Sequence, residues 1–388
     1  MSTSAGTNLT VQLLPCAAKL LASTDLVTKK LASWYVARHS CSNSDVSILT
    51  INTLVTDLSD PNPVVRSLAV RTLAGLRLPE LAEHGINAVN SGLNDTDAVV
   101  RRAAVLACIQ IFQTSPSAVI DGGLVDRLYS LIRDTDAVVV VNCLDALQEI
   151  LADEGGVVIN RNMARYLQQR LTSFPEPQCA AVLKYLIKYQ PRDETEALDI
   201  MNVADTFLDS SNAVILISAL RYFLSIVSHS RLSHLRTDIM TRAENSVFRL
   251  VSSDSHETVY AVIQFMRQEL VGEFTEILCR HYTAILCHSN DPAYLKVVKI
   301  QLLADIADNS TVQGVLDELN TQARNKSPTV IICLIDIRYC SYLAMFATPS
   351  HKFTYTKLTN YLRLITTLLH DDILFCHKAF LLLLMSFL

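Results

Sequence analysis

The stretch Asp95-Thr-Asp-Ala-Val-Val-Arg-Arg-Ala-Ala-Val-Leu-Ala, residues 95–107, decides the fold, because close variants of it stand on either side. Asp60-Pro-Asn-Pro-Val-Val-Arg-Ser-Leu-Ala-Val precedes it, and Asp134-Thr-Asp-Ala-Val-Val-Val-Val-Asn-Cys-Leu follows it. In each copy a polar turn leads to a residue whose side-chain oxygen can accept from the free N–H groups that begin a helix. These capping residues are Asn62, Asp97 and Asp136. Pro63 suits a first helical turn, where its missing N–H costs no bond. A helix is therefore predicted to begin at each turn.

Each predicted helix has one apolar face. Apolar or methyl-bearing residues recur at steps of four, three and four, as one side of an α-helix requires. They are Val65, Ala69, Thr72 and Leu76; Val100, Ala104, Ala107 and Ile111; Val139, Cys143, Ala146 and Ile150. The middle positions carry small side chains, so we expect neighbouring helices to approach closely there.

The copies recur at a nearly regular spacing. Asp95 lies 35 residues after Asp60, and Asp134 lies 39 residues after Asp95. Weaker copies of the turn follow at intervals of 39, 37, 44 and 36 residues, at Ser173, Ser210, Asp254 and Asn290. A period of this length with two helical patterns per unit is typical of HEAT or armadillo repeats. The sequence therefore predicts an all-α fold, a right-handed HEAT/armadillo-type α-solenoid built from stacked helix pairs.

Three of the copies place a basic residue six positions after the turn residue. We expect each basic side chain to bond the turn of its own or a neighbouring repeat, so that the turns form a ladder along the stack. The alternative is that these charges are independent and solvated. The predicted ladder consists of Asp60, Arg66, Asp95, Arg101, Asp134 and Lys296.

Composition restricts the classes of function. The 388 residues carry a formal net charge of -5, and no run of Lys or Arg exceeds two residues, which argues against binding to a nucleic-acid backbone. Charged residues make up 18% of the chain and the mean hydropathy is +0.28, which is apolar for the surface of an elongated protein. We therefore expect partner proteins to cover part of this surface.

No catalytic, cofactor or metal motif is found. The sequence has no Gly-x-Ser-x-Gly, no His-Glu-x-x-His, no phosphate-binding glycine loop and no calcium loop. The ten cysteines include no Cys-x-x-Cys pair, so we expect buried thiols in place of zinc ligands. The predicted protein is a scaffold without enzymatic activity, cofactor or metal.

Three regions are expected along the chain. Residues 1–16 are predicted to be loose, residues 17–325 to form the repeat trunk, and residues 326–388 to form a divergent helical tail. The uncharged run Ala379–Leu388 is shorter than the roughly 20 residues that a membrane-spanning helix needs. Lys29 and Lys30 lie together on a predicted helix, where they are candidates for contacting membrane phosphates or an acidic partner; the alternative is a solvated surface.

Several short segments of the sequence resemble those of a known family. They include Val27-Thr-Lys-Lys-Leu-Ala-Ser-Trp-Tyr, Leu49-Thr-Ile-Asn-Thr-Leu, Leu76-Arg-Leu-Pro and Asn290-Asp-Pro-Ala-Tyr-Leu-Lys. Together with the three turn copies, they resemble the trunk of the beta-type large adaptins over roughly residues 17–325. Residues 125–136 and 154–160 are most similar to the beta subunit of the fourth adaptor complex, and the clathrin-linked first and second complexes stay open.

The resemblance implies a non-enzymatic subunit of a heterotetrameric adaptor complex in vesicle-mediated transport. It implies a second large adaptin, a medium subunit and a small subunit as partners. It also implies a cytoplasmic protein that an Arf-family GTPase recruits to the surface of trans-Golgi or endosomal membranes. No segment of the leucine–apolar–any–apolar–acid kind that binds clathrin is found, which leaves clathrin contact doubtful. The alternative function is a HEAT scaffold of a phosphatase-type or karyopherin-type assembly.

Overall fold

The fold is helical throughout the described part of the chain. In the computed structural model these residues are 4–78, 81–228, 233–307 and several positions between 311 and 322, and they contain no strand. The predicted tail, residues 326–388, lies outside this part. The chain divides into two compact units, Met1–Val203 and Ala204–Leu388. No helix in the described ranges combines the length and the apolar character that crossing a membrane requires. The predicted all-α class is confirmed.

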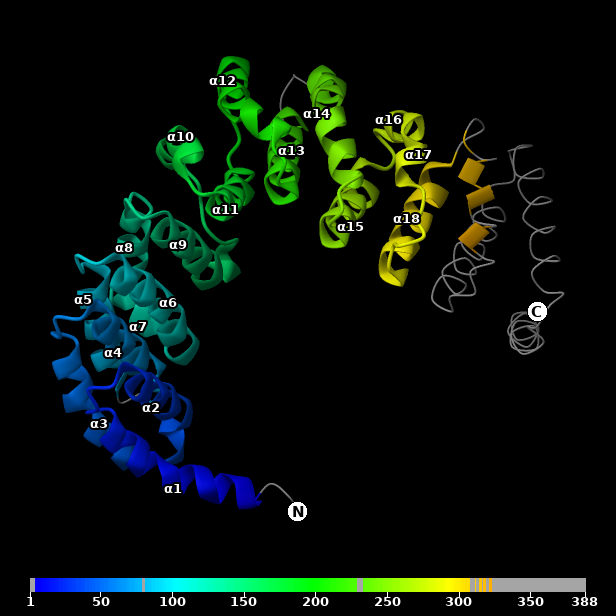
Figure 1. The fold of residues 1–388 in the computed structure, drawn as a ribbon. Helices are drawn as coiled ribbons and strands as arrows, with labels where there is room; N and C mark the ends of the chain where they lie inside the picture. Colours follow the sequence, from blue (N-terminus) through cyan, green and yellow to red (C-terminus); the bar gives the residue numbers. More distant parts are fainter. Residues whose placement is uncertain are drawn as a thin grey trace, which may run out of the picture. The chain divides into compact units, whose positions relative to one another are not determined.

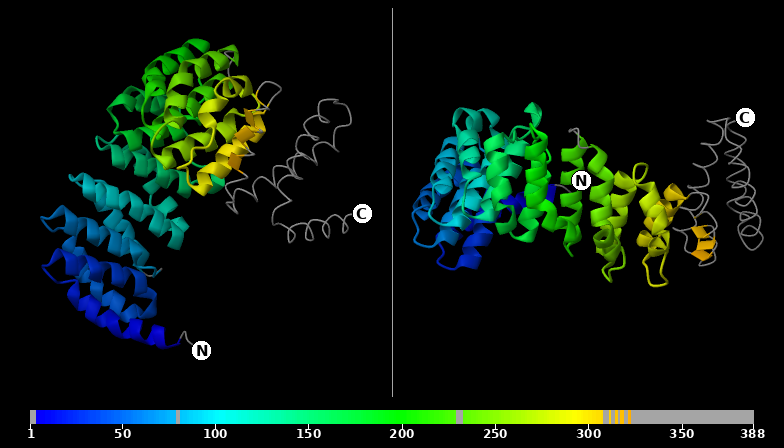
Figure 2. Two further views of the ribbon diagram at one scale, coloured as in Figure 1. Left: turned by 45° about the vertical axis from the view of Figure 1, so that its right-hand side comes forward. Right: turned by 90° about the horizontal axis from the view of Figure 1, so that it is seen from above.

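The first unit is a stack of helix pairs (Figures 1 and 2). The second helices of successive pairs pack against one another, α2 on α4, α4 on α6, α6 on α9 and α9 on α11. Short 3₁₀ turns connect several helices. The helices are α1 Ser4–Leu20, α2 Leu26–His39, α3 Ser44–Asp57, α4 Pro63–Gly75, α5 Ala82–Leu93, α6 Ala98–Thr114, α7 Pro116–Asp121, α8 Leu124–Leu131, α9 Ala137–Ile150, α10 Arg161–Arg170, α11 Glu176–Leu186 and α12 Glu194–Ala204.

The second unit continues the same kind of packing. Helix α13 packs on α14 and α15, and α15 packs on α18 (Figure 1). A single π-helical turn, Met266–Leu270, follows α15 directly. The helices of this unit are α13 Ala213–Ser228, α14 Arg236–Val251, α15 His256–Phe265, α16 Thr275–Arg280, α17 Tyr282–Ile285 and α18 Ala293–Ile306.

The predicted capping residues begin their helices. The side chain of Asn62 accepts from the backbone N–H of Val64, and Pro63 opens α4. The side chain of Asp97 does the same at α6 and that of Asp136 at α9. Each cap satisfies N–H groups that have no partner within the helix. The helix starts expected from the three turn copies are confirmed.

The predicted apolar faces form the core of the first unit. All twelve predicted face positions are buried; eleven lie on α4, α6 and α9, and Leu76 follows the last residue of α4. The hydroxyl of Thr72 donates to the carbonyl of Leu68 within its own helix. Two thiols, Cys108 and Cys143, are fully buried in the same layer. Burial raises the pKa of Cys108 to about 12, so this side chain packs as a neutral, small apolar group.

The small residues at the middle of the faces allow close helix approach, as predicted. Gly92 of α5 lies so near α6 that a Cβ atom at this position would meet the Cβ of Ala104 at 2.9 Å. The same Cβ would meet a methyl group of Val70 on α4 at 3.2 Å. Gly92 therefore sits where three helices of two successive pairs converge.

The prediction that residues 1–16 are loose is wrong for residues 4–16, which are helical. Helix α1 runs through this segment and contains Pro15. It packs on α2 and α3 and buries Leu14 and Ala17, and Leu21 directly after it is buried as well. The Ser, Thr and Gly residues and the proline have low intrinsic helix propensity, but an apolar face packed against neighbouring helices outweighs such preferences.

Candidate functional site

The first link of the turn ladder is formed by Arg66. Its Nε and Nη2 atoms donate to the two carboxylate oxygens of Asp95 at 2.8 and 2.9 Å. Its Nη1 atom donates to the backbone carbonyls of Asp60 and Pro61 at 2.9 and 3.2 Å. One guanidinium therefore joins its own turn to the turn of the next repeat, in a bidentate geometry that lysine cannot reproduce.

Arg101 repeats this arrangement one pair further along. It donates to both carboxylate oxygens of Asp134 at 2.7 and 3.0 Å. It also donates to the backbone carbonyls of Asp95 and Thr96, each at 2.9 Å. The neighbouring Arg102 donates through Nε to the carboxylate of the capping residue Asp136 at 2.9 Å. Sequence reasoning missed Arg102, although it stands directly beside Arg101.

The carboxylates of the ladder are held in their charged form. The hydrogen bond with Arg66 lowers the pKa of Asp95. Burial of Asp134 opposes ionisation, but hydrogen bonds from Arg101 and from the backbone N–H of Asp136 lower its pKa more than burial raises it. The hydrogen bond with Asp134 raises the pKa of Arg101. These links therefore remain ionic at neutral pH.

The turn at Asp134 has no arginine of its own. Val140 stands where the first two copies have Arg66 and Arg101, and it is fully buried. Arg170, at the end of α10, takes over this role from the next repeat. Its Nη1 donates to the carbonyl of Asp134 at 2.6 Å and its Nη2 to the carbonyl of Thr135 at 3.0 Å. The guanidinium also lies over the rings of Tyr166 and Phe174.

Lys296 contacts its own turn without an acidic partner among the described residues. Its Nζ atom donates to the carbonyl of Ser289 at 3.3 Å. The ion pair of this repeat is made by Lys299, whose Nζ donates to Asp291 at 2.7 Å. Lys299 is almost completely buried. The sequence pattern therefore predicted a cation at this turn, Lys296, but it did not identify Lys299, which pairs with the carboxylate of Asp291.

Lys29 is part of the fold, so its predicted role as a partner or membrane contact is wrong. Only 8% of the residue is exposed, and its Nζ donates to Asp57 at 2.7 Å. Lys29 lies four residues after the capping Asp25, just as Arg66 lies four residues after Asn62. It therefore occupies the position of a ladder cation in α2, although its partner is Asp57 at the end of α3 and not the turn residue Asp60. Lys30 is exposed, because one residue further along a helix turns the side chain by about 100°.

An exposed apolar stripe runs along α2 beside Lys30. Val27, Leu31 and Trp34 are 66%, 63% and 65% exposed, and their spacing of four and three places them on one side of the helix. Leu31 lies six residues after its cap, and the equivalent positions in α4 and α6, Leu68 and Ala103, are buried. No described residue of this chain covers the stripe, which makes it a candidate surface for a partner.

Comparison with known families decides the family. The sequence pattern of the adaptin N terminal region matches residues 5–372. The chain belongs to the adaptin family. The match extends beyond both ends of the 17–325 trunk expected from the sequence, so those limits stay predictions.

Curated relatives of this adaptin are beta-type subunits. It is 39% identical over 304 residues to the mouse "AP-4 complex subunit beta-1", covering 78% of this chain and 40% of that protein. It is 32% identical to the "Beta-adaptin-like protein A" of Arabidopsis thaliana, covering 78% of this chain and 37% of that protein. It is 27% identical to the human "AP-1 complex subunit beta-1", covering 80% of this chain and 33% of that protein. The chain therefore spans less than half the length of these relatives.

Two known structures share the fold of this adaptin. A chain of an AP-3 complex in an intermediate open conformation, itself a homology model, aligns with a TM-score of 0.53 at 18% identity, over 96% of this chain and 65% of that one. Importin beta aligns with a TM-score of 0.56 at 15% identity, over 87% of this chain and 47% of that one. Similarity at these levels of identity concerns the solenoid fold alone.

Proposed function

We propose that this adaptin is a non-enzymatic beta subunit of an adaptor complex that acts in vesicle-mediated intracellular protein transport. The observation that carries the proposal is the family match over residues 5–372, combined with 39% identity to a beta subunit of the fourth adaptor complex. The proposed partners are a second large adaptin, a medium subunit and a small subunit. A stack of helix pairs joined by ionic links provides a stiff, extended surface on which such subunits can assemble.

The proposed place of action is the cytoplasmic surface of trans-Golgi and endosomal vesicles. An Arf-family GTPase in its GTP-bound form would recruit the complex there. The exposed stripe of Val27, Leu31 and Trp34 supports this part of the proposal, because protein interfaces are centred on exposed aromatic and aliphatic side chains. Lys30 beside the stripe would add a cation for an acidic loop of the GTPase or for lipid phosphates.

Affinity isolation from cells tests the complex. The tagged chain is expected to recover a medium and a small adaptor subunit together with a second large adaptin. Recovery of a phosphatase catalytic subunit or of Ran, without adaptor subunits, would support the alternative of a phosphatase-type or karyopherin-type scaffold. The similarity to importin beta supports only the shared solenoid fold, whereas the family match supports the function of an adaptor subunit.

Liposome recruitment tests the GTPase. Leu31→Asp combined with Trp34→Asp is expected to reduce binding to liposomes that carry an Arf-family GTPase loaded with a non-hydrolysable GTP analogue, by about tenfold or more. Val158→Asp is the matched control, because Val158 is equally exposed (67%) but lies in the loop before α10. Equal recruitment of the α2 double variant and the control would remove the stripe from the proposal.

A further inference from the structure

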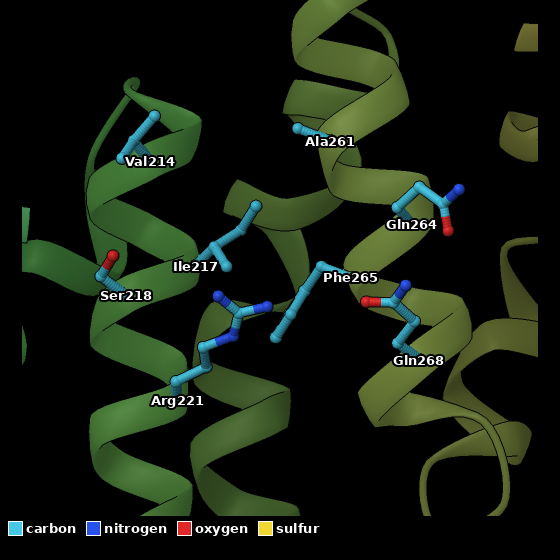
Figure 3. Close-up of a pocket in the computed structure, with 8 residues that line it drawn as sticks. All are labelled: Val214, Ile217, Ser218, Arg221, Ala261, Gln264, Phe265 and Gln268. Carbon is cyan, nitrogen blue, oxygen red and sulfur yellow. The ribbon is translucent and has the colours of Figure 1, made fainter. Parts of the chain in front are cut away.

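The second unit contains a groove between α13 and α15 (Figure 3). The two helices contribute equally spaced residues to its walls, at positions i, i+3, i+4 and i+7 of each. Such spacing keeps four side chains on one side of a helix, so the two faces are aligned along the whole groove. The lining residues are Val214, Ile217, Ser218 and Arg221 from α13, and Ala261, Gln264, Phe265 and Gln268 from α15 and the π-helical turn.

The groove stays open because two of its wall residues, one on each helix, have short side chains. Ser218 lies near the middle of one wall and Ala261 at the Val214 end of the other, and neither side chain reaches across to the opposite helix (Figure 3). Ile217 and Phe265 are buried and form an apolar floor, whereas Val214 is 60% exposed at one end. The apolar surface that an apolar side chain of a ligand could cover is therefore that of Val214 and Ala261 at this end, both of which are exposed.

The other end of the groove carries a cation. Arg221 donates through Nε to Glu269 at 2.7 Å, and its guanidinium lies 5.5 Å from the ring centroid of Phe265. The π-helical turn makes this geometry, since it directs Glu269 toward α13 while Arg267 donates to Asp305 of α18. Turns of this kind are frequent at functional sites. A guanidinium has five N–H groups, so Arg221 can bond a second carboxylate while it keeps Glu269.

The size of the groove favours an extended peptide over a helix. Its volume is about 240 Å³, below the ~300 Å³ at which small-ligand pockets begin. A helix with its side chains is about 10 Å wide and could not enter. Gln264 and Gln268 are separated by four residues, roughly 6 Å along the helix axis. This distance is close to the ~6.6–6.8 Å that two residues of an extended chain span. Gln264 Nε2 donates to the hydroxyl of Tyr260 at 3.1 Å, which leaves its second N–H and its oxygen for a peptide unit, as Gln268 can offer to the next unit facing the same way.

We propose that the groove between α13 and α15 binds an extended peptide segment of a partner protein that carries an apolar side chain and, a few residues away, a carboxylate. The apolar side chain packs against Val214 and Ala261, above the buried floor of Ile217 and Phe265. The carboxylate bonds Arg221, and the amides of Gln264 and Gln268 bond the peptide backbone. This site is separate from the α2 stripe, and it does not depend on assembly with adaptor subunits.

Peptide arrays on the intact chain test this proposal. The probes are labelled octapeptides on a Gly/Ser background, each with one Leu and one Asp separated by one to four residues. Matched sets replace Asp by Asn or Leu by Ser. Binding is measured by fluorescence anisotropy for the wild type and for three variants. Ala261→Phe fills the groove, Arg221→Met removes the cation but keeps the aliphatic stem, and Ser91→Phe adds the same ring at an exposed position of α5. Thermal unfolding checks that all three fold.

The proposal expects at least one Leu–Asp spacing to bind the wild type. Ala261→Phe should weaken this binding tenfold or more, and Ser91→Phe should leave it unchanged. Arg221→Met should weaken the Asp peptide at least fivefold and leave its Asn counterpart unchanged. The proposal is overturned if no peptide of the array binds, if Ala261→Phe binds as well as the wild type, or if a helix-stapled form of the best peptide binds more tightly than the linear form.

Discussion

Arg170 donates to the backbone carbonyl of Asp134 at 2.6 Å, although the two residues stand 36 positions apart in the chain. Arg101 bonds the carboxylate of the same aspartate from the preceding repeat. The turn is thus held from both sides by arginines of different repeats. Where buried Val140 replaces the local arginine, the neighbouring repeat supplies the missing bonds. Ionic links across turns, and not only the apolar faces, therefore fix how successive helix pairs are joined.

Replacing Arg170 should weaken the first unit. Arg170→Met keeps the aliphatic stem but leaves the carbonyls of Asp134 and Thr135 without this donor, so the free energy of unfolding should fall by about 1–3 kcal/mol. Urea unfolding measures it. Arg165→Met is the control, because this arginine of the same helix is largely exposed and lies 3.7 Å from Glu196; its effect should stay within about 0.5 kcal/mol. Equal effects of the two variants would contradict the role of Arg170.

Stability should fall as the ladder carboxylates take up protons. Asp95 and Asp134 have lowered pKa values in the folded state, so the unfolded chain binds protons first, near the ordinary value of about 3.9. Their contribution is complete above about pH 5 and is lost as the pH falls through the folded-state values. Melting temperatures measured from pH 6 to pH 3 should fall less steeply for Asp134→Asn than for the wild type. Parallel curves would show that the ladder does not contribute to acid sensitivity.

Replacing Lys29 should destabilise the fold, whereas replacing Lys30 should not. Lys29→Met leaves Asp57 buried without its ion pair, which should cost about 2–4 kcal/mol of unfolding free energy, toward the lower end of what breaking a buried pair costs. Lys30→Met changes an exposed side chain and should alter stability by less than about 0.5 kcal/mol. Chemical unfolding of the two variants side by side measures both free energies of unfolding. If Lys29→Met is as stable as Lys30→Met, the ion pair of Lys29 does not stabilise the fold.

Gly92 should tolerate no larger side chain. Gly92→Ala places a Cβ at 2.9 Å from Ala104, whose position on α6 is fixed by the backbone, so we expect a loss of about 1–3 kcal/mol. Gly85→Ala on the same helix meets its nearest atoms at 3.4 Å, an ordinary contact, and gains helix propensity. This control should be neutral or more stable than the wild type. Thermal unfolding of both variants checks the close approach of α5 and α6.

Local patterns predicted the helix starts and the core faces correctly. A cap such as Asp97 acts on N–H groups of its own helix, and a step of four, three and four residues is a property of one helix. Both can therefore be seen within about fifteen residues of sequence. The relation of Arg66 and Arg101 to their own turns is local in the same sense, which is why the repeat revealed it.

Other features depend on contacts between repeats, and the sequence did not reveal them. Arg170 was missed because its partners belong to the preceding repeat. Arg249 makes the comparable contact with the carbonyls of Asp209 and Ser210, but it stands at a different distance from its turn, 39 residues in place of 36. Lys29 was predicted to lie at the surface because two adjacent lysines indicate a polar edge of a helix. Its distance of four residues from the capping Asp25 was the signal that could have placed it beside the next helix pair. The apolar groove at Ala261 requires two helices to face each other, which no single periodic pattern encodes.

Reconstitution tests the central claim most directly. The chain is co-expressed with the second large adaptin, the medium subunit and the small subunit of a fourth adaptor complex, and the mixture is analysed by size-exclusion chromatography with mass photometry. A beta-type adaptin is expected to elute with the other three as one species of equal stoichiometry. Elution of the folded chain by itself, while the other three subunits remain together, would contradict the proposed role as a beta subunit.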